Sequence, residues 1–134
     1  AGIKEASGDM SYAMKIAHCV GPDFALYSGN DDITVPLMSI GGSGVISVYA
    51  NVMPAMCHQI VADWLGGNHA RALENHLRYL KLMNDLFLEV NPIPVKAAMN
   101  MMGLNVGPVR LPLCEMGEAN AAVLRRTLEE AGLL

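Results

Sequence analysis

The stretch of sequence that decides the fold is Gly-Ile-Lys-Glu-Ala-Ser-Gly, which runs from Gly2 to Gly8. It predicts a short buried β-strand that ends in a glycine-marked turn. Lys4 lies where the strand gives way to this turn, a place that suits chemistry better than packing. An amine desolvated by apolar neighbours loses its proton more readily and can attack a carbonyl to form a Schiff base. On this segment alone an ordinary solvated lysine is the favoured interpretation, so Lys4 has to be weighed with the rest of the chain.

The N-terminal part of the chain alternates between strand and helix patterns. After the first strand, we expect a helix over 10–20, a strand over 24–27, a helix over 35–40 and a strand over 45–48. Asp9 is the expected N-cap of the first helix, and the apolar run Phe24–Tyr27 is typical of a strand buried on both faces. The run Gly41–Gly44 is a tight connection into the third strand. This alternation predicts a parallel sheet with crossover helices.

The rest of the chain carries helix patterns only. Helices are expected over 54–65, 69–90, 95–102 and 118–131. The long pattern over 69–90 has an apolar stripe on one face, formed by Leu73, Leu77, Leu80 and Phe87. The sheet is therefore expected to be followed by an all-helical tail.

Three consecutive parallel strands are not a stable object by themselves, because two strand edges stay open. We therefore expect an α/β fold made of the last three βα strands of a (β/α)8 TIM barrel, followed by a C-terminal helical extension. Residues 1–50 would form strands six to eight, and residues 51–134 the final barrel helix and the helical region. The chain reads as if it began in the middle of something larger. A small open α/β sandwich is the structural alternative.

Composition argues against several classes of function. The net charge of −4 and the pI of about 5.4 give no electrostatic reason to expect a nucleic acid or an anionic membrane as partner. No apolar stretch reaches the roughly 18 residues of a membrane-spanning helix, and no signal-peptide pattern opens the sequence. Cys19, Cys57 and Cys114 are widely spaced and odd in number. They indicate buried thiols in a reducing cytoplasm.

Histidines and paired acids are the remaining candidates for chemistry. His18, His58, His69 and His76 lack the spacing of a helical ligand pair, so we interpret them as surface or cap residues and expect no metal site. Asp31 and Asp32 resemble a pair of catalytic carboxylates. At a helix start, however, they serve the helix dipole just as well.

Five motifs carry a resemblance to a known family. They are Gly2–Gly8, Ser28–Asp31, Gly44–Val48, Asn91–Lys96 and Arg110–Leu113. Their order and spacing resemble dihydrodipicolinate synthase, and the match covers the C-terminal half of that enzyme, from its sixth barrel strand to its last helix. The Asn-Pro-Ile-Pro-Val-Lys run favours the synthase over the related N-acetylneuraminate lyase.

The resemblance implies a class I aldolase-type lyase of lysine biosynthesis that needs no cofactor. Pyruvate would condense with the ε-amine of Lys4, and the resulting enamine would add to aspartate semialdehyde. Ile46 matches a residue whose backbone lies against bound pyruvate, and Gly29 matches a glycine near the mouth of the site. Asn30 departs from the aspartate that many relatives carry there, so no polar role is carried over to it.

The resemblance also implies that much of the catalytic machinery lies in the N-terminal half of the family's barrel. The carboxylate-binding threonines, the proton-relay tyrosine and the arginine for the aldehyde all belong there. The expected partners are therefore that half of the barrel and further copies in a dimer or tetramer. Two alternatives stay open: an inactive half-barrel that self-associates, and a related pyruvate-dependent aldolase such as N-acetylneuraminate lyase.

Overall fold

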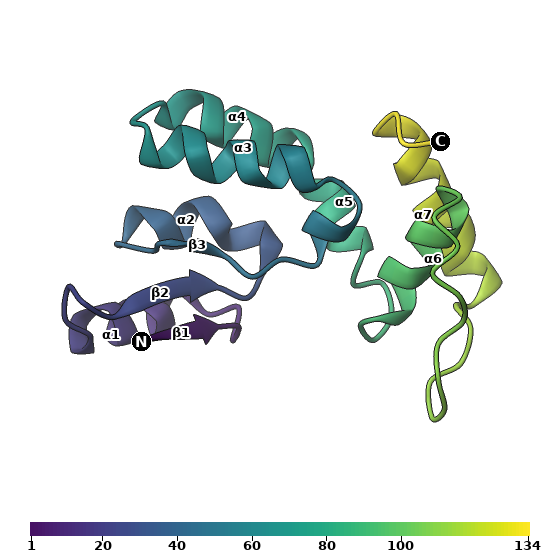
Figure 1. Ribbon diagram of the computed structural model, residues 1–134, viewed down its shortest axis with the longest axis horizontal. Helices are drawn as coiled ribbons and strands as arrows, with labels where there is room; N and C mark the ends of the chain where they lie inside the picture. Colours follow the sequence, from purple (N-terminus) through teal and green to yellow (C-terminus); the bar gives the residue numbers. More distant parts are fainter. The chain divides into compact units, whose positions relative to one another are not determined.

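The structure is a computed structural model that describes all residues from 1 to 134. Two compact units make up the chain (Figure 1). The sheet unit comprises residues 1–47 and 55–78, and the helical unit comprises residues 48–54 and 79–134. None of the helices combines the length and the apolar character that crossing a membrane requires.

The sheet unit contains three strands, four α-helices and a short 3-10 helix, η1. The elements are β1 (Gly2–Glu5), α1 (Met10–Cys19), β2 (Ala25–Ser28), η1 (Asp31–Ile33), α2 (Thr34–Ser39), β3 (Gly44–Val45), α3 (Pro54–Leu65) and α4 (His69–Arg78). The strands pair in parallel in the order β1-β2-β3, which confirms the predicted sheet. The carboxyl ends of all three strands therefore meet at one edge.

Packing of α1 and α2 against the sheet forms the core of this unit. Ala13 of α1, Leu26 of β2 and Leu37 of α2 are at most 2% exposed and form one cluster. The cap of α1 is the predicted one, because Asp9 Oδ1 accepts hydrogen bonds from the N–H groups of Ser11 and Tyr12. The prediction that β2 is buried on both faces was wrong. Leu26 and Ser28, which point to the same face, are buried, while Ala25 and Tyr27 on the other face are half-buried. The helices cover the face to which Leu26 points.

The third strand is shorter than the predicted Val45–Val48. Pairing ends at Val45, and Val48 already has helical dihedral angles before the 3-10 helix η2 (Tyr49–Asn51). The β-branched residues favour a strand locally, but Tyr49 is 1% exposed and its ring lies 6.1 Å from that of Tyr79. Burial of this aromatic pair outweighs strand propensity.

The helical unit contains η2 and three further helices, α5 (Leu80–Asp85), α6 (Ile93–Met101) and α7 (Glu118–Glu130). The single helix predicted over 69–90 was wrong, because Tyr79 interrupts it with non-helical dihedral angles. The predicted stripe is divided by this interruption: Leu73 and Leu77 lie on α4 and are 44% and 57% exposed, whereas Ala72 and His76 on the same helix are buried. The buried face of α4 is thus set by a small residue and a polar one.

Candidate active site

The register of the sheet aligns the three predicted site residues at one edge. Glu5 pairs with Ser28, and Ser28 pairs with Val45, so the last residues of all three strands are level. Lys4 precedes this level, while Gly29 and Ile46 follow it on the next two strands. In parallel α/β sheets this carboxyl edge is where ligands bind.

Gly29 is the predicted site residue that lies against Lys4. A Cβ atom built on Gly29 would lie 3.0 Å from Lys4 Cε and 2.5 Å from Ala6 Cβ. Both distances are shorter than an ordinary van der Waals contact. The N–H of Gly29 also donates to the carbonyl oxygen of Glu5 at 2.5 Å. The bare backbone at residue 29 therefore lets the β2 turn come close to the stem of Lys4.

Ile46 occupies the corresponding position after β3. Its N–H donates to the carbonyl oxygen of Ser28 at 2.8 Å, and its residue surface is 49% exposed. The backbone of Ile46 is thus fixed to the end of β2. The structure ties Gly29 to Lys4 and ties Ile46 to Ser28, one strand further from the lysine.

The Lys4 side chain is exposed, and so are its neighbours Ile3 and Ala6. The expectation that apolar neighbours within this chain desolvate the amine was therefore wrong. The reason is the alternation of side chains along a strand. Glu5 points to the covered face of the sheet and is 3% exposed, while Lys4 points to the opposite face.

Glu5 is a site-edge residue that sequence reasoning missed. Its Oε1 accepts the N–H of Ser7 at 2.7 Å, which fixes the turn after β1. Its Oε2 is buried without a hydrogen-bond partner. The period of two along the strand was the available signal, because it places Lys4 and Glu5 on opposite faces.

The turn after β2, residues 28–34, is held by short-range side-chain hydrogen bonds. Ser28 Oγ donates to the carbonyl oxygen of Asn30 at 2.7 Å, and Thr34 Oγ1 donates to that of Asp31 at 2.9 Å. The side chains of Ser28, Asp31 and Thr34 are all buried. Asp31 and Asp32 lie in η1, and Asp31 is an interior residue instead of an exposed member of a carboxylate pair.

His76 is buried beneath this turn, so the interpretation of all four histidines as surface or cap residues was wrong for this one. It is 2% exposed, and its Nε2 lies 2.9 Å from the carbonyl oxygen of Asp32. Burial is the main cause that lowers the pKa of His76, and the hydrogen bond and charges of the neighbouring aspartates oppose it. The spacing of Ala72, His76 and Tyr79 on one helical face was the signal that could have predicted this burial.

Cys57 of α3 is the buried thiol of the chain, whereas Cys19 and Cys114 are exposed, contrary to expectation. Burial raises the pKa of the Cys57 thiol; a hydrogen bond with Ser47 acts against this rise and the charge of Asp31 adds to it. A thiol held in its protonated form is a poor nucleophile. No group of three or more potential metal-ligating side chains occurs in the structure.

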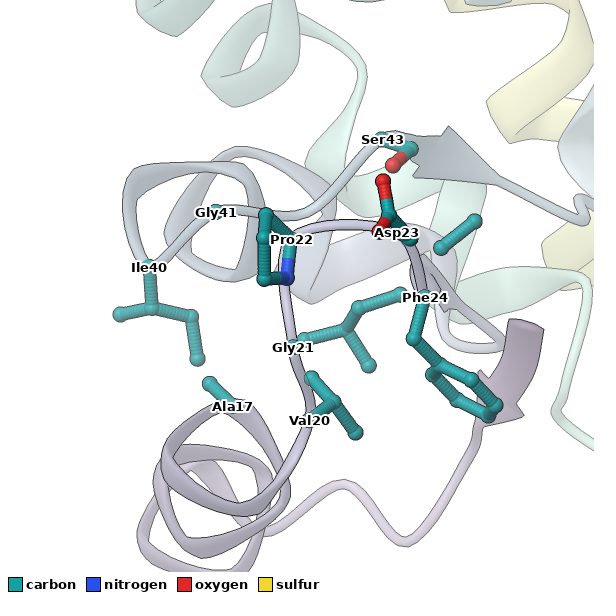
Figure 2. Close-up of a pocket in the computed structure, with 11 residues that line it drawn as sticks. Ala17, Val20, Gly21, Pro22, Asp23, Phe24, Ile40, Gly41 and Ser43 are labelled. Carbon is teal, nitrogen blue, oxygen red and sulfur yellow. The ribbon is translucent and has the colours of Figure 1, made fainter. Parts of the chain in front are cut away.

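A cavity of about 330 Å³ lies at the opposite end of the sheet, where α1 ends and β2 begins (Figure 2). Most of its wall is apolar or glycine, and Asp23 and Ser43 are the polar side chains that line it. The amino ends of barrel strands generally serve stability. We therefore assign no site to this cavity.

The fold and the lysine edge define a class of protein: a partial parallel α/β barrel with a lysine at the carboxyl end of a strand. Residues 1–131 match the dihydrodipicolinate synthetase family. The chain belongs to this family.

Named relatives are similar over nearly the whole chain. The 4-hydroxy-tetrahydrodipicolinate synthase of Clostridium perfringens is 50% identical over 132 residues, which are 98% of this chain and 45% of that protein. The crystal structure of dihydrodipicolinate synthase from Thermotoga maritima has a TM-score of 0.95 at 43% identity, and the match covers 99% of this chain and 46% of that one. The enzyme from Acinetobacter baumannii, solved in complex with pyruvate, has a TM-score of 0.94 at 36% identity, with coverage of 100% and 46%. This chain thus spans about 45% of the length of the relatives it matches.

Proposed function

We propose that this chain carries the Schiff-base lysine, Lys4, of a synthase that condenses pyruvate with aspartate semialdehyde in lysine biosynthesis. The closeness of Lys4 Cε to Gly29, where it lies 3.0 Å from the position that a Cβ atom would take, is the observation that supports this proposal most directly, because both residues lie at the common carboxyl edge of three parallel strands. Membership of the dihydrodipicolinate synthetase family supports the reaction that we propose. We expect it to take place in the cytoplasm, since three unpaired thiols suit a reducing compartment.

The proposed chemistry begins at the amine of Lys4. Its nitrogen attacks the keto carbon of pyruvate, and loss of water gives an imine. Removal of a methyl proton then gives an enamine, whose carbon attacks the aldehyde of aspartate semialdehyde. Attack of the substrate's own amino group on the imine carbon closes the ring and releases Lys4.

We propose that residues 1–50 act as strands six to eight of a barrel, and residues 51–134 as its final helix and helical tail. The exposed Lys4 then needs a second surface to exclude water from its amine. The N-terminal half of a barrel, with its proton-relay tyrosine and carboxylate-binding threonines, is the proposed source. Ile46 and Gly29 would contribute backbone to the pyruvate site.

Borohydride trapping tests the lysine directly. The chain is incubated with isotopically labelled pyruvate and reduced, with and without an N-terminal half-barrel, and the modified residue is located by mass spectrometry. We expect labelling at Lys4, loss of labelling in Lys4→Arg, and unchanged labelling in the control Lys15→Arg on α1. Failure to label Lys4 in the complemented protein contradicts the proposal. Consumption of aspartate semialdehyde, in preference to a sugar aldehyde, separates the synthase from an N-acetylneuraminate lyase.

A second candidate role is self-association of the chain as a half-barrel. Leu73 and Leu77 form an exposed apolar stripe on α4, and β1 and β3 are both edge strands. Both features favour burial by another copy. Sedimentation analysis is expected to show a dimer or tetramer that the double substitution Leu73→Ser, Leu77→Ser dissociates, and a stable monomer before substitution contradicts this role.

A further inference from the structure

The turn that carries Gly29 is attached to other elements of the sheet unit at its start and near its end. At its start, the N–H of Gly29 donates to Glu5 at the end of β1. Near its end, the carbonyl oxygen of Asp32 meets Nε2 of His76, which is 44 residues away in the sequence. The side-chain hydrogen bonds of Ser28 and Thr34 lie within the turn, whereas the carbonyl oxygen of Ser28 accepts the N–H of Ile46 after β3.

The chemistry of this contact fixes the protonation of the imidazole ring. A carbonyl oxygen only accepts hydrogen bonds, so Nε2 of His76 carries the proton and donates to Asp32. Nδ1 is then an acceptor, and it is buried without a partner. Asp31 and Asp32 of η1 are the acidic groups near the ring. Helix α2, which also packs on α4, contributes no titratable side chain.

A buried acceptor without a partner destabilises a fold, and an apolar residue at position 76 would avoid this penalty. Unlike an apolar residue at this position, His76 donates a hydrogen bond to Asp32. It holds the η1 end of the turn against α4, while the other end of the same turn lies against Lys4 Cε. A shift of the turn would therefore change the position of the lysine stem.

We propose that His76 is a positioning residue for the lysine site, which fixes the turn 29–32 through its hydrogen bond to Asp32 and thereby sets the position of Lys4. The inference rests on the proposed function for its catalytic consequence. The structural part, that His76 controls the turn and the Lys4 stem, stands on the contacts alone.

Four variants test whether the Nε2–H donor of His76, and not only the packing of its side chain, holds the turn. His76→Leu removes the donor and keeps an apolar side chain of moderate size, and His76→Asn keeps a polar amide that is too short to replace Nε2. His76→Gln restores an N–H donor at about the reach of Nε2. His58→Leu is the matched control, because His58 is an exposed histidine on α3.

Two measurements do not depend on catalysis. Amide hydrogen exchange at Gly29 reports whether the turn stays attached to β1, and the carbon resonance of Lys4 Cε reports the position of the stem. We expect faster exchange at Gly29 and a shifted Lys4 Cε resonance in His76→Leu and His76→Asn. His76→Gln and His58→Leu are expected to behave as the unmodified chain. If both donor-less variants fold and leave Gly29 and Lys4 unchanged, the proposal is wrong; should His76→Leu fail to fold, His76→Asn decides.

A third measurement connects the turn to chemistry. The rate of pyruvate trapping at Lys4 is expected to fall in His76→Asn by on the order of ten- to a hundredfold, the effect of a small misplacement of a reacting group. His76→Gln should recover most of this rate, and a purely structural role predicts instead that trapping stays unchanged while exchange at Gly29 rises. If the unmodified chain traps no pyruvate even when it is complemented by an N-terminal half-barrel, the proposed function fails, and exchange at Gly29 and the Lys4 resonance alone decide whether His76 positions the lysine.

Discussion

The sheet unit and the helical unit differ in how their polar side chains are bonded. In the helical unit, Lys81, Asp85 and Thr127 bond to one another across α5 and α7, and Glu89 accepts hydrogen bonds from Gly117 and Asn120. In the sheet unit, three buried polar atoms lack a partner: Glu5 Oε2, Asn30 Oδ1 and His76 Nδ1. All three belong to residues on or beneath the turns at the strand ends.

The polar groups of the helical unit join its helices, whereas the unpartnered polar groups of the sheet unit lie on or beneath the turns that follow the strands. Natural proteins satisfy their buried polar groups, and exceptions call for a reason other than stability. In the sheet unit, two of the exceptions belong to Glu5 and Asn30, the chain neighbours of Lys4 and Gly29, and the third belongs to His76. We infer that the helical unit is optimised for packing, whereas the strand ends of the sheet unit retain energetically unfavourable groups for the sake of position.

The largest expected effect tests whether the two units are separate cooperative regions. Leu37 in the sheet unit and Leu128 in the helical unit are both fully buried. Replacing either by alanine is expected to lower the free energy of unfolding by about 2–5 kcal/mol. Hydrogen exchange should rise mainly in the unit that carries the substitution. Leu65→Ala, at a 65% exposed position, serves as control, and equal acceleration throughout the chain would contradict the division.

The next effect concerns the close approach at Gly29. Gly29→Ala is expected to lower the free energy of unfolding by about 1–3 kcal/mol, since the new methyl group overlaps Ala6 and the carbonyl of Glu5. Gly21→Ala is the matched control, because nothing lies within 4 Å of the position that its methyl group would occupy. Chemical denaturation measures both, and an equal response of the two variants would refute the claim of close contact.

A smaller effect is the pH dependence of the free energy of unfolding, which we expect His76 to contribute in the sheet unit. The folded state lowers the pKa of His76 from its ordinary value, so the unfolded chain takes up the proton first as the pH falls. The stability contribution of His76 is therefore complete above about pH 6.5 and is lost below it, with a slope of at most about 1.4 kcal/mol per pH unit. Denaturation midpoints of the unmodified chain and His76→Gln between pH 7.5 and 5 would reveal the difference, and parallel curves would exclude it.

The smallest effect is expected in the helical unit. Lys81→Met removes an ammonium that is 56% exposed and pairs with Asp85 at 2.8 Å. Exposed pairs of this kind contribute about 0–1 kcal/mol and weaken with salt. We expect a loss within this range at low salt that shrinks at high salt, compared with Lys15→Met in the sheet unit. A loss several times larger would show that the network supports α5 and α7 more strongly than its exposure indicates.

Local signals were sufficient for much of the fold. Asp9 predicts the start of α1, because an aspartate cap is a local interaction. The run Gly41–Gly44 predicts a connection, because glycine readily adopts the positive φ angles observed at Gly41 (+97°) and Gly44 (+151°). The position of Lys4 at a strand end likewise follows from its own neighbours. These features depend on residues that are close in the sequence.

Features that depend on distant residues escaped sequence reasoning. Tyr79 ends α4 although its neighbours favour a longer helix, and it is 9% exposed beside Tyr49. The burial of His76 depends on the turn at Asp32, and the exposure of Lys4 depends on which face of the sheet the helices cover. Periodicity places a residue on a face, but it does not say which face another element will cover.

The outer edge of β1 has a consequence for engineering. This edge strand presents backbone N–H and C=O groups that no neighbouring strand in the sheet occupies, and its other side is already locked in register with β2. Such an edge accepts an added strand in a single alignment, which is the property required of one fragment in a reconstituted reporter. Fusing the chain and a complementary barrel fragment to two interacting proteins would turn recovery of lysine reactivity into a signal of their encounter.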